Sequence, residues 1–432
     1  MSALKKLLIK GGKVVSPADD LNEELDLLVG DGKVTEVAEE IDAPEAEVID
    51  ATDKIVTPGL IDMHVHLREP GFEHKEDIKS GTESAAAGGF TSVACMPNTE
   101  PVVDNATVVN YINDKAKINA KVNVFPIGSI TKGLEGKELA EIGFMKEAGI
   151  VAISDDGETV MNSELMKLAL EYVKAFDLPV ISHCEDKTLT ENGVVHEGYY
   201  STVTGLDAIP AAAEDIIVAR DIRLAEMTGT PLHIAHVSTK RAVELVRDAK
   251  ARGVQVTAEV TPHHFTLTDE AITTFDTNTK VNPPLRSSED VAVIKEGLAD
   301  GTIDVIATDH APHAWEEKDV EYDYAPFGIA GLETALPLVI TELVKPEVLS
   351  LEEAIEKLTV NPAQILSLNK GSLTVGEDAD ITVIDLDQEY EVDANKFYSK
   401  GKNSPFIGEV LGGRAVATIV NGKLVMKNNE IL

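Results

Sequence analysis

The sequence predicts an α/β protein, a (β/α)8 barrel of the TIM type with a small β-sandwich domain built from both chain termini. Two observations predict the barrel. Short β-branched runs alternate with stretches of helical spacing through the middle of the 432-residue chain, as in parallel strands joined by crossover helices. There are eight such runs, and the roughly 310 residues from 58 to 368 suffice for a barrel with insertions. The sandwich is predicted because both ends of the chain contain only β-type runs and turns.

The eight runs are expected to form the barrel strands in chain order. They are DMHVHL (62–67), FTSVACM (90–96), KVNVFPIG (121–128), GIVAIS (149–154), PVISHC (179–184), LHIAHV (232–237), VQVTAEV (254–260) and DVIATD (304–309). Between them, segments such as NSELMKLALEYVKAF have apolar residues at helical spacing. A doubly wound open sheet is the alternative, but no G-x-G-x-x-G follows the first run, which favours the barrel.

The two ends of the chain are expected to form one domain together. Asp31-Gly32 and Asn421-Gly422 are typical of two-residue hairpin turns. Each end has only about 60 residues, too few to bury a sufficient core alone. The predicted division is therefore 1–57 and 369–432 for the two parts of the β-sandwich, and 58–368 for the barrel.

The composition argues against several classes of protein. A net charge of −37 and an aromatic content of 4% argue against binding to nucleic acid or to an anionic membrane surface. No stretch approaches eighteen apolar residues, so no membrane span is predicted. The N-terminus lacks the apolar core of a secretory signal, and Cys95 and Cys184 are not in a C-x-x-C motif. These features predict a cytoplasmic protein.

Histidine or aspartate residues close five of the predicted strands. They are His64 and His66 on the first, Asp155 and Asp156 on the fourth, His183 on the fifth, His236 on the sixth and Asp309 on the eighth. A lone histidine is a weak signal, but the carboxyl ends of all barrel strands meet at one mouth. Four imidazoles and two carboxylates gathered there suit two divalent metal ions.

The neighbouring polar residues are expected to play other roles. Asp155 should face away from the mouth, because side chains alternate along a strand. His233, three residues before His236, is predicted to face the opposite way and to pack against an outer helix or donate to a carbonyl. His263 and His264, in TPHH, are candidates for orienting the metal ligands.

Two of these segments resemble the signature motifs of the dihydroorotases, in the cyclic-amidohydrolase branch of the amidohydrolase superfamily. They are DMHVHLREP (62–70) and ATDHAPHAWEEK (307–318). MPNT (96–99), SDDG (154–157), SHCED (182–186), AHVST (235–239) and VNPPLR (281–286) occupy the intervening strand ends in the same order. GSLTVGEDADITVID (371–385) resembles the return into the superfamily's small β-domain. The likeness covers essentially the whole chain, and it is to the longer, zinc-dependent type I enzymes.

The resemblance implies two zinc ions per subunit. Their ligands would be His64, His66 and Asp309 for one ion, His183 and His236 for the other, and Asp156 with a hydroxide as the bridge. Many relatives use a carboxylated lysine as this bridge. Here the nearest lysine, Lys146, lies ten residues before Asp156, at the wrong end of its strand. An enzyme with one metal ion is the alternative.

The family's reaction is the reversible hydrolysis of L-dihydroorotate to N-carbamoyl-L-aspartate, and its reverse serves de novo pyrimidine (UMP) biosynthesis. The resemblance implies a metal-bridged hydroxide as nucleophile and Asp309 as general base and then acid. The implied substrate-binding residues are His66, Arg68, Asn98, Asn282, His313, Phe327 and Gly328. Arg68 would bind the ring carboxylate through its guanidinium, and the alternative for Arg68 is a salt bridge at the barrel rim.

Two alternatives stay open at this stage. A hydantoinase, dihydropyrimidinase or allantoinase would share the fold and the H-x-H motif, but these enzymes typically carry the bridging lysine. A non-catalytic dihydroorotase-like subunit of aspartate carbamoyltransferase would be expected to have lost metal ligands. If the protein is a dihydroorotase, the resemblance implies a homodimer, and an association with aspartate carbamoyltransferase stays open.

Overall fold

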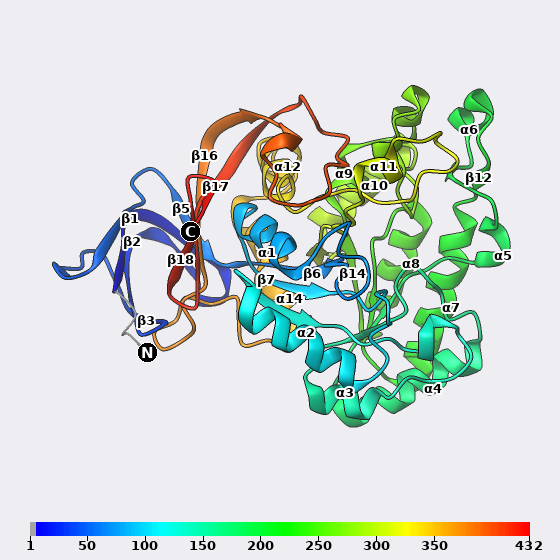
Figure 1. The fold of residues 1–432 in the computed structure, drawn as a ribbon, viewed down its shortest axis with the longest axis horizontal. Coiled ribbons are helices and arrows are strands. Elements are labelled where there is room, and N and C mark those ends of the chain that lie inside the picture. The colour runs from blue at the N-terminus through cyan, green and yellow to red at the C-terminus, as the bar shows by residue number, and fades with distance from the viewer. Residues whose placement is uncertain (1–5) are drawn as a thin grey trace.

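The central part of the chain forms a closed barrel of eight parallel strands, seen at the right of Figure 1. The computed structural model describes residues 6–432. The first five residues, which begin the N-terminal stretch compared above with a secretory signal, lie outside the described part. The barrel strands are β6 (Leu60–Val65), β7 (Phe90–Cys95), β8 (Asn123–Pro126), β9 (Ile153–Ser154), β10 (Val180–Ser182), β13 (Leu232–Ile234), β14 (Val256–Val260) and β15 (Val305–Ile306). Each falls within, or overlaps, one of the eight predicted runs.

Two isolated β-bridges close the barrel. Hydrogen bonding groups the strands as β6-β7-β8 and as β15-β14-β13-β10-β9. A bridge between Gly128 and Ile153 joins β8 to β9, and one between Val65 and His310 joins β6 to the end of β15. The predicted barrel is therefore confirmed, and consecutive strands lie side by side as in a TIM barrel.

Helices surround the barrel and cover its apolar outer surface. The main ones are α1 (Ile78–Ala87), α2 (Ala106–Asn119), α3 (Ile142–Ala148), α4 (Ser163–Val173), α7 (Ala212–Thr228), α8 (Lys240–Ala251), α10 (Ser288–Ala299), α12 (Ala335–Val339), α13 (Leu351–Leu358) and α14 (Val360–Ile365). Shorter elements in the loops are α5 (Lys187–Thr190), β11 (Val195–His196), α6 (Tyr199–Thr204), β12 (Ala208–Ile209), α9 (Pro262–Thr266) and α11 (Trp315–Lys318). In the described residues no helix is both long and apolar enough to cross a membrane.

Alternation along the strands separates two apolar layers. Outward residues such as Val93, Val180 and Ile234 pack against the helices, whereas Met63 and Ile181 fill the barrel interior. On β10 the inward set continues past Ile181 to His183, at the carboxyl end of the strand. The same period of two that buries the barrel core therefore directs polar side chains into the mouth.

Both ends of the chain share one nine-stranded sheet, at the left of Figure 1. Its strands are β1 (Leu7–Ser16), β2 (Leu21–Gly30), β3 (Lys33–Ala38), β4 (Glu47–Asp50), β5 (Ile55–Pro58), β16 (Ile381–Glu391), β17 (Val410–Val420), β18 (Lys423–Lys427) and β19 (Glu430–Ile431). Antiparallel pairing of β5 with β16 joins the two ends. The β-domain built from both termini is confirmed, and hydrogen bonding makes it one continuous sheet.

The two predicted hairpin turns are present and touch each other. Asp31-Gly32 and Asn421-Gly422 all have positive φ, between 48° and 83°, as type I′ turns require. A Cβ added to Gly422 would lie 2.6 Å from the Gly32 Cα. Gly422 is therefore needed both for its conformation and for this close approach of the two ends of the chain.

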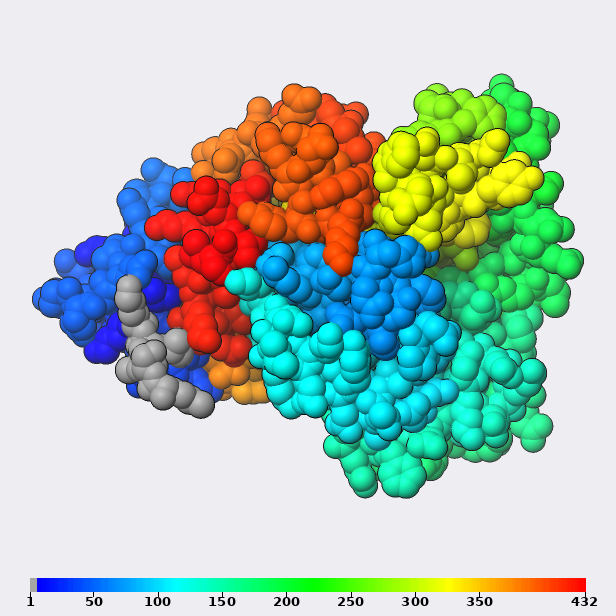
Figure 2. All heavy atoms as spheres, viewed as in Figure 1, coloured from blue at the N-terminus to red at the C-terminus, as the bar shows by residue number. Residues whose placement is uncertain are grey.

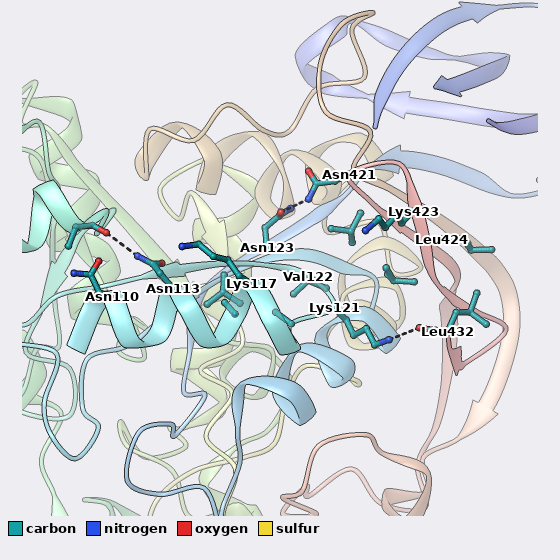
Figure 3. A pocket seen from close by; sticks show the side chains of 16 residues that line it. Asn110, Asn113, Lys117, Lys121, Val122, Asn123, Asn421, Lys423, Leu424 and Leu432 are labelled. Carbon is teal, nitrogen blue, oxygen red and sulfur yellow. Dashed lines mark hydrogen bonds between the residues drawn. The ribbon is translucent and has the colours of Figure 1, made fainter. Parts of the chain in front are cut away.

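A surface groove lies where this sheet meets the barrel, at the amino end of β8 (Figure 3). Its volume is about 770 Å³, and its lining includes Lys117, Lys121 and Lys423. None of the predicted metal or substrate residues lines this groove. The predicted chemistry lies instead at the carboxyl ends of the strands.

Candidate metal centre

His64 and His66 face two carboxylates from other strands. His64 is the second-last residue of β6 and His66 comes directly after the strand, so the two side chains, two residues apart, project into the mouth together. Asp156 Oδ1 lies 3.3 Å from His64 Nε2, and Asp156 Oδ2 lies 3.4 Å from His66 Nε2. Asp309 Oδ1 is 3.0 Å from His66 Nε2 and 3.5 Å from His64 Nε2. The structure thus brings together the residues predicted for the first ion.

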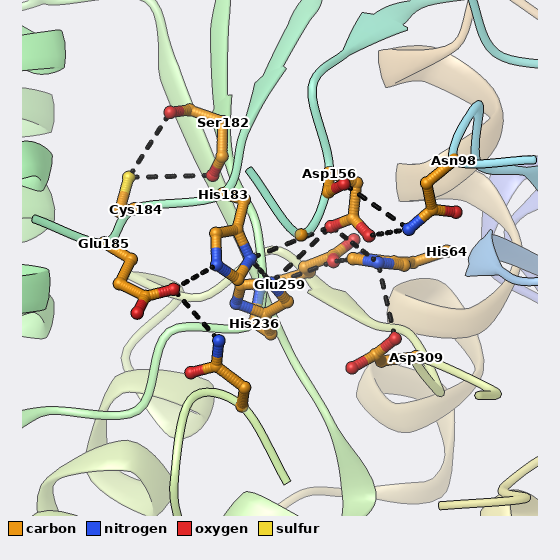
Figure 4. Close-up of polar contacts among 12 residues, drawn as sticks. His64, Asn98, Asp156, Ser182, His183, Cys184, Glu185, His236, Glu259 and Asp309 are labelled. Carbon is orange, nitrogen blue, oxygen red and sulfur yellow. Dashed lines mark hydrogen bonds and ion pairs between the residues drawn. The ribbon is translucent and has the colours of Figure 1, made fainter. Parts of the chain in front are cut away.

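A second group meets on the other side of Asp156 (Figure 4). His183 Nδ1 and His236 Nε2 are 2.9 Å apart, and each lies 3.8 Å from Asp156 Oδ1. Asp156 therefore belongs to both groups of potential metal ligands, one with His64 and His66 and one with His183 and His236. This shared position is the one that the family resemblance implies for the bridge.

The donor set fits divalent metal ions. His64 Nε2 and Asp156 Oδ1 are buried, and within the described part of the chain neither has a hydrogen-bond partner. Burial by itself raises the pKa of Asp156, but the neighbouring histidines hold that pKa well below its usual range. Burial lowers the pKa of His64, yet Glu259, Asp156 and Asp309 raise it well above the ordinary value. A buried site that stabilises positive charge so strongly, with imidazole and carboxylate donors, is suited to metal binding.

Glu259 supports His64 from inside the barrel, and the sequence reasoning missed it. It lies on β14 and is fully buried. His64 Nδ1 is 2.5 Å from one carboxylate oxygen of Glu259, and His233 Nε2 is 3.1 Å from the other. A hydrogen bond at Nδ1 leaves Nε2 of His64 free to bind a metal. The alternation in VTAEV, which points Thr257 and Glu259 inward between apolar residues, is the signal that could have revealed it.

The prediction for His233 was wrong. His233 does not pack against an outer helix. It lies inside the barrel, bonded to Glu259 and, through Nδ1, to Thr257 Oγ1 at 2.8 Å. The strand alternation does separate it from His236, but His236 has a φ of 34°, and the strand ends before it at Ile234. Because the regular strand ends at Ile234, His236 reaches Asp156 in the metal site, whereas His233 contacts Glu259 inside the barrel.

Asp155 faces away from the mouth, as expected. It accepts hydrogen bonds from the backbone N–H groups of Ile130 and Thr131, at 2.7 and 3.0 Å. His264, a candidate for orienting ligands, instead bonds to Thr261 Oγ1 and the carbonyl of Pro283. Asp155 and His264 are therefore supports for the surrounding loops.

Arg68 and His313 contact each other at the rim of the barrel mouth. Arg68 Nη2 is 3.4 Å from His313 Nε2, and Arg68 Nε donates to the carbonyl of Pro312 at 3.3 Å. Burial and the charge of Arg68 lower the pKa of His313 to about 2, so the positive charge here belongs to Arg68. His313 Nε2 also lies 2.8 Å from the carbonyl of Phe327. Three residues predicted to bind substrate are thus in contact with one another.

Of the two asparagines predicted to bind substrate, Asn98 contacts the metal-site residues directly, and Asn282 contacts them through Glu185. Asn98 Oδ1 is 2.9 Å from His66 Nδ1, and its Nδ2 is 3.4 Å from Asp156. Asn282 Nδ2 donates at 3.0 Å to Glu185, which lies 3.1 Å from His183 Nε2. Glu185 was also missed, although its place two residues after His183 in SHCED puts it on the same face.

The backbone N–H of Gly328 is already engaged. It donates to the carbonyl of Lys280 at 2.9 Å. A Cβ at Gly328 would lie 2.7 Å from the carbonyl oxygen of Ala311 and 3.2 Å from His313 Nε2. With a φ of 136°, Gly328 allows two loops of the rim to approach closely.

Three site residues have a left-handed backbone that is uncommon outside glycine. The φ values are 61° for Arg68, 34° for His236 and 47° for Asp309. Such conformations cost free energy, and they gather at functional sites where the surrounding structure holds them. Each lies two or three residues after the end of a barrel strand.

Comparison with known proteins agrees with this site. Residues 53–242 match the family described as "Dihydro-orotase-like", and residues 327–426 match the one described as "Amidohydrolase family". A protein named dihydroorotase from Pelotomaculum thermopropionicum is 61% identical over 426 residues, which is 99% of this chain and 100% of the relative. One of the same name from Acetivibrio thermocellus is 58% identical, with the same coverage.

Among solved structures, an L-hydantoinase (dihydropyrimidinase) from Arthrobacter aurescens has the same fold. Its TM-score is 0.90 at 30% identity, over 99% of this chain and 97% of that chain. It supports the barrel with an appended β-domain. The full-length relatives of much higher identity are named dihydroorotase, so the hydantoinase alternative is not favoured. The chain belongs to the dihydroorotase family of the amidohydrolases.

Proposed function

We propose that this protein is a metal-dependent cyclic amide hydrolase that interconverts L-dihydroorotate and N-carbamoyl-L-aspartate, in de novo pyrimidine (UMP) biosynthesis. The observation that supports this most directly is the position of Arg68. The Arg68 guanidinium contacts His313 and lies near enough to Asp309 and Asp156 to feel their charge, where a ring carboxylate would need a partner. A neutral cyclic ureide would not need that charge.

The proposed cofactor is a pair of zinc ions. Three residues, His64, His66 and Asp309, would hold one ion, while His183 and His236 would hold the other and Asp156 would bridge the two. Zinc in such a site supplies Lewis acidity, which acidifies water and polarises a carbonyl. Elemental analysis of the purified protein should give about two zinc ions per chain, as a two-metal site requires. A content of one ion or fewer would contradict the bridging role of Asp156.

Asp309 is proposed to move the proton. Burial opposes its ionisation, but His64 and His66 hold the pKa of Asp309 below its usual range. The carboxylate is therefore ionised at neutral pH and is able to accept a proton from the attacking water. As the C–O bond forms and the ring C–N bond breaks, Asp309 returns that proton to the departing nitrogen. In ring closure the same steps run in reverse.

Replacing Arg68 by methionine tests the carboxylate clamp. We expect Arg68→Met to lower kcat/KM for dihydroorotate by about 10- to 100-fold, because a charge-assisted pair contributes about 1.5–3 kcal/mol. The zinc content should not change, since Arg68 bonds to Pro312 and His313 and not to a predicted ligand. Full activity in this variant would refute the clamp.

The decisive assay compares L-dihydroorotate with hydantoin, side by side, on zinc-loaded protein. Strong preference for dihydroorotate is expected. Preference for hydantoin would move the protein to the neighbouring branch of the superfamily. Turnover of neither, with metal bound, would favour a structural subunit of aspartate carbamoyltransferase.

The remaining expectations concern partners and location. We propose a cytoplasmic homodimer that acts on small molecules and binds neither nucleic acid nor membrane. Light scattering coupled to size exclusion would measure the mass of the assembly against the 46.3 kDa chain. The same experiment with added aspartate carbamoyltransferase would test for association.

A further inference from the structure

A segment from the C-terminal part of the chain reaches the barrel mouth. Residues 399–404, SKGKNS, lie between β16 and β17 of the terminal sheet, but they pack against the barrel and not against that sheet. Figure 2 shows an orange segment from the C-terminal part of the chain against the blue segment around α1 and beside a yellow segment of the barrel. We call residues 399–404 the C-terminal strap.

Two carboxylates of the barrel anchor the strap. Glu76 is fully buried and accepts from Ser399 Oγ at 2.5 Å and from the backbone N–H of Lys400 at 3.2 Å. Glu333 accepts from the backbone N–H groups of Tyr398 and Ser399, at 2.8 and 3.2 Å. The strap is therefore held in one position against the barrel.

Asn403 links two loops of the rim. Its side chain is buried, with 3% exposed. Oδ1 accepts from the backbone N–H of His313 at 3.0 Å, while Nδ2 donates to the carbonyls of Ala311 and Gly328 at 3.1 and 2.9 Å. One amide thus fixes the spacing between the loop that carries His313 and the loop that carries Gly328.

Gly401 lets the strap approach the loop that holds Arg68. A Cβ at Gly401 would lie 2.5 Å from Pro312 Cβ and 2.8 Å from Asn403 Oδ1. The carbonyl of Pro312 is the acceptor for Arg68 Nε. Any larger residue at 401 would therefore displace either Pro312 or the Asn403 amide.

We infer that Asn403 is a positioning residue for the substrate-carboxylate pocket and that Gly401 sets its distance from the barrel. This rests on the proposed function, because the pocket in question is the one formed by Arg68 and His313. The strap touches neither metal group, so it should control binding of the carboxylate and not metal loading. A part of the chain that belongs to the β-domain by sequence position would then determine substrate affinity in the barrel.

The test is Asn403→Ala, with Asn395→Ala as the matched control. Asn395 is an exposed asparagine on the same stretch of chain that bonds only locally, to Asp393. In Asn403→Ala the KM for dihydroorotate and for carbamoyl-aspartate should rise together by about tenfold, because the loops that carry His313 and Gly328 lose the amide that sets their spacing. The kcat should stay within about threefold and the zinc content should not change, because the ligands keep their own supports. The control should match the unmodified protein.

A second variant covers the case in which Asn403→Ala does not fold. In Gly401→Ala the side-chain amide is retained but Pro312 must move, so KM should rise without loss of metal. Unchanged KM in both variants, or a fall in kcat and zinc content with KM unchanged, would overturn the inference. Failure of the proposed function would look different, since the unmodified protein would then not turn over dihydroorotate at all.

Discussion

At the residue scale, the orientation of His64 depends on Glu259, a fully buried carboxylate on the inner side of the metal ligands. His64 Nδ1 bonds to Glu259, which also bonds to His233. This arrangement holds the imidazole ring and its tautomer, so that Nε2 faces Asp156 and Asp309. A ligand histidine without such support would rotate and would bind metal less tightly.

We therefore predict that Glu259→Leu weakens metal binding about 10- to 100-fold, the usual effect of removing a partner of a ligating histidine. Zinc affinity would be measured by competition with a chromogenic chelator, and folding by circular dichroism. Glu259→Gln is the matched variant, because its amide oxygen can still accept from His64 Nδ1, and it should lose less affinity. Equal zinc affinity in Glu259→Leu and the unmodified protein would exclude this role.

At the element scale, the strap and the barrel meet at Glu333, just before α12. Its carboxylate accepts from Ser84 Oγ at 2.9 Å as well as from the backbone N–H groups of Ser399, in the strap, and of Tyr398, which precedes it. Burial raises the pKa of Glu333 to about 7, although these hydrogen bonds oppose the rise. Unfolding returns the group to its ordinary pKa of 4.5. The contribution to stability is then fully present below pH 4.5 and is lost as the pH rises to about 7.

Glu333→Gln should remove this pH dependence while its amide oxygen keeps the same hydrogen bonds. Relative to the variant, the unmodified protein should lose at most about 3 kcal/mol of stability between pH 4.5 and pH 8, from 1.36 kcal/mol per pKa unit. Thermal melts of both proteins at pH 5 and pH 8 would measure the difference. Exposed Glu391→Gln serves as control and should follow the unmodified protein. A difference that does not depend on pH would contradict the assigned titration.

At the scale of the whole molecule, the net charge of −37 acts on every element at once. Like charges repel one another in the folded state, and salt screens this repulsion. Raising sodium chloride from 10 mM to 500 mM at pH 8 should raise Tm by about 2 °C or more, which for a large domain corresponds to about 1 kcal/mol. At pH 5.5, closer to the pI of 4.6, the shift should be much smaller. The same shift at both pH values would show that screening is not the cause.

Much of the fold and most of the site could be predicted because they depend on local patterns. Residues on one face of a strand repeat with a period of two, and the ends of barrel strands converge, so the positions of His64, Asp156, His183 and Asp309 followed from the chain itself. Glu259 and Glu185 were missed, because alternation along VTAEV and the spacing in SHCED show which way their side chains face but not that each bonds to a ligand histidine. The domain boundaries at 57/58 and 368/369 stay a prediction.

The sequence by itself determined the barrel, the β-domain shared by both ends and the set of candidate metal ligands, because each depends on periodicity and residue type. Only the tertiary structure decided which groups support those ligands. The left-handed backbone at Arg68, His236 and Asp309 is likewise visible only in the folded chain, since these residue types rarely adopt it by local preference. The placement of Asn403 against His313 is another such case, since the two residues are 90 positions apart. Contacts of that range depend on how the whole chain packs, and no local pattern encodes them.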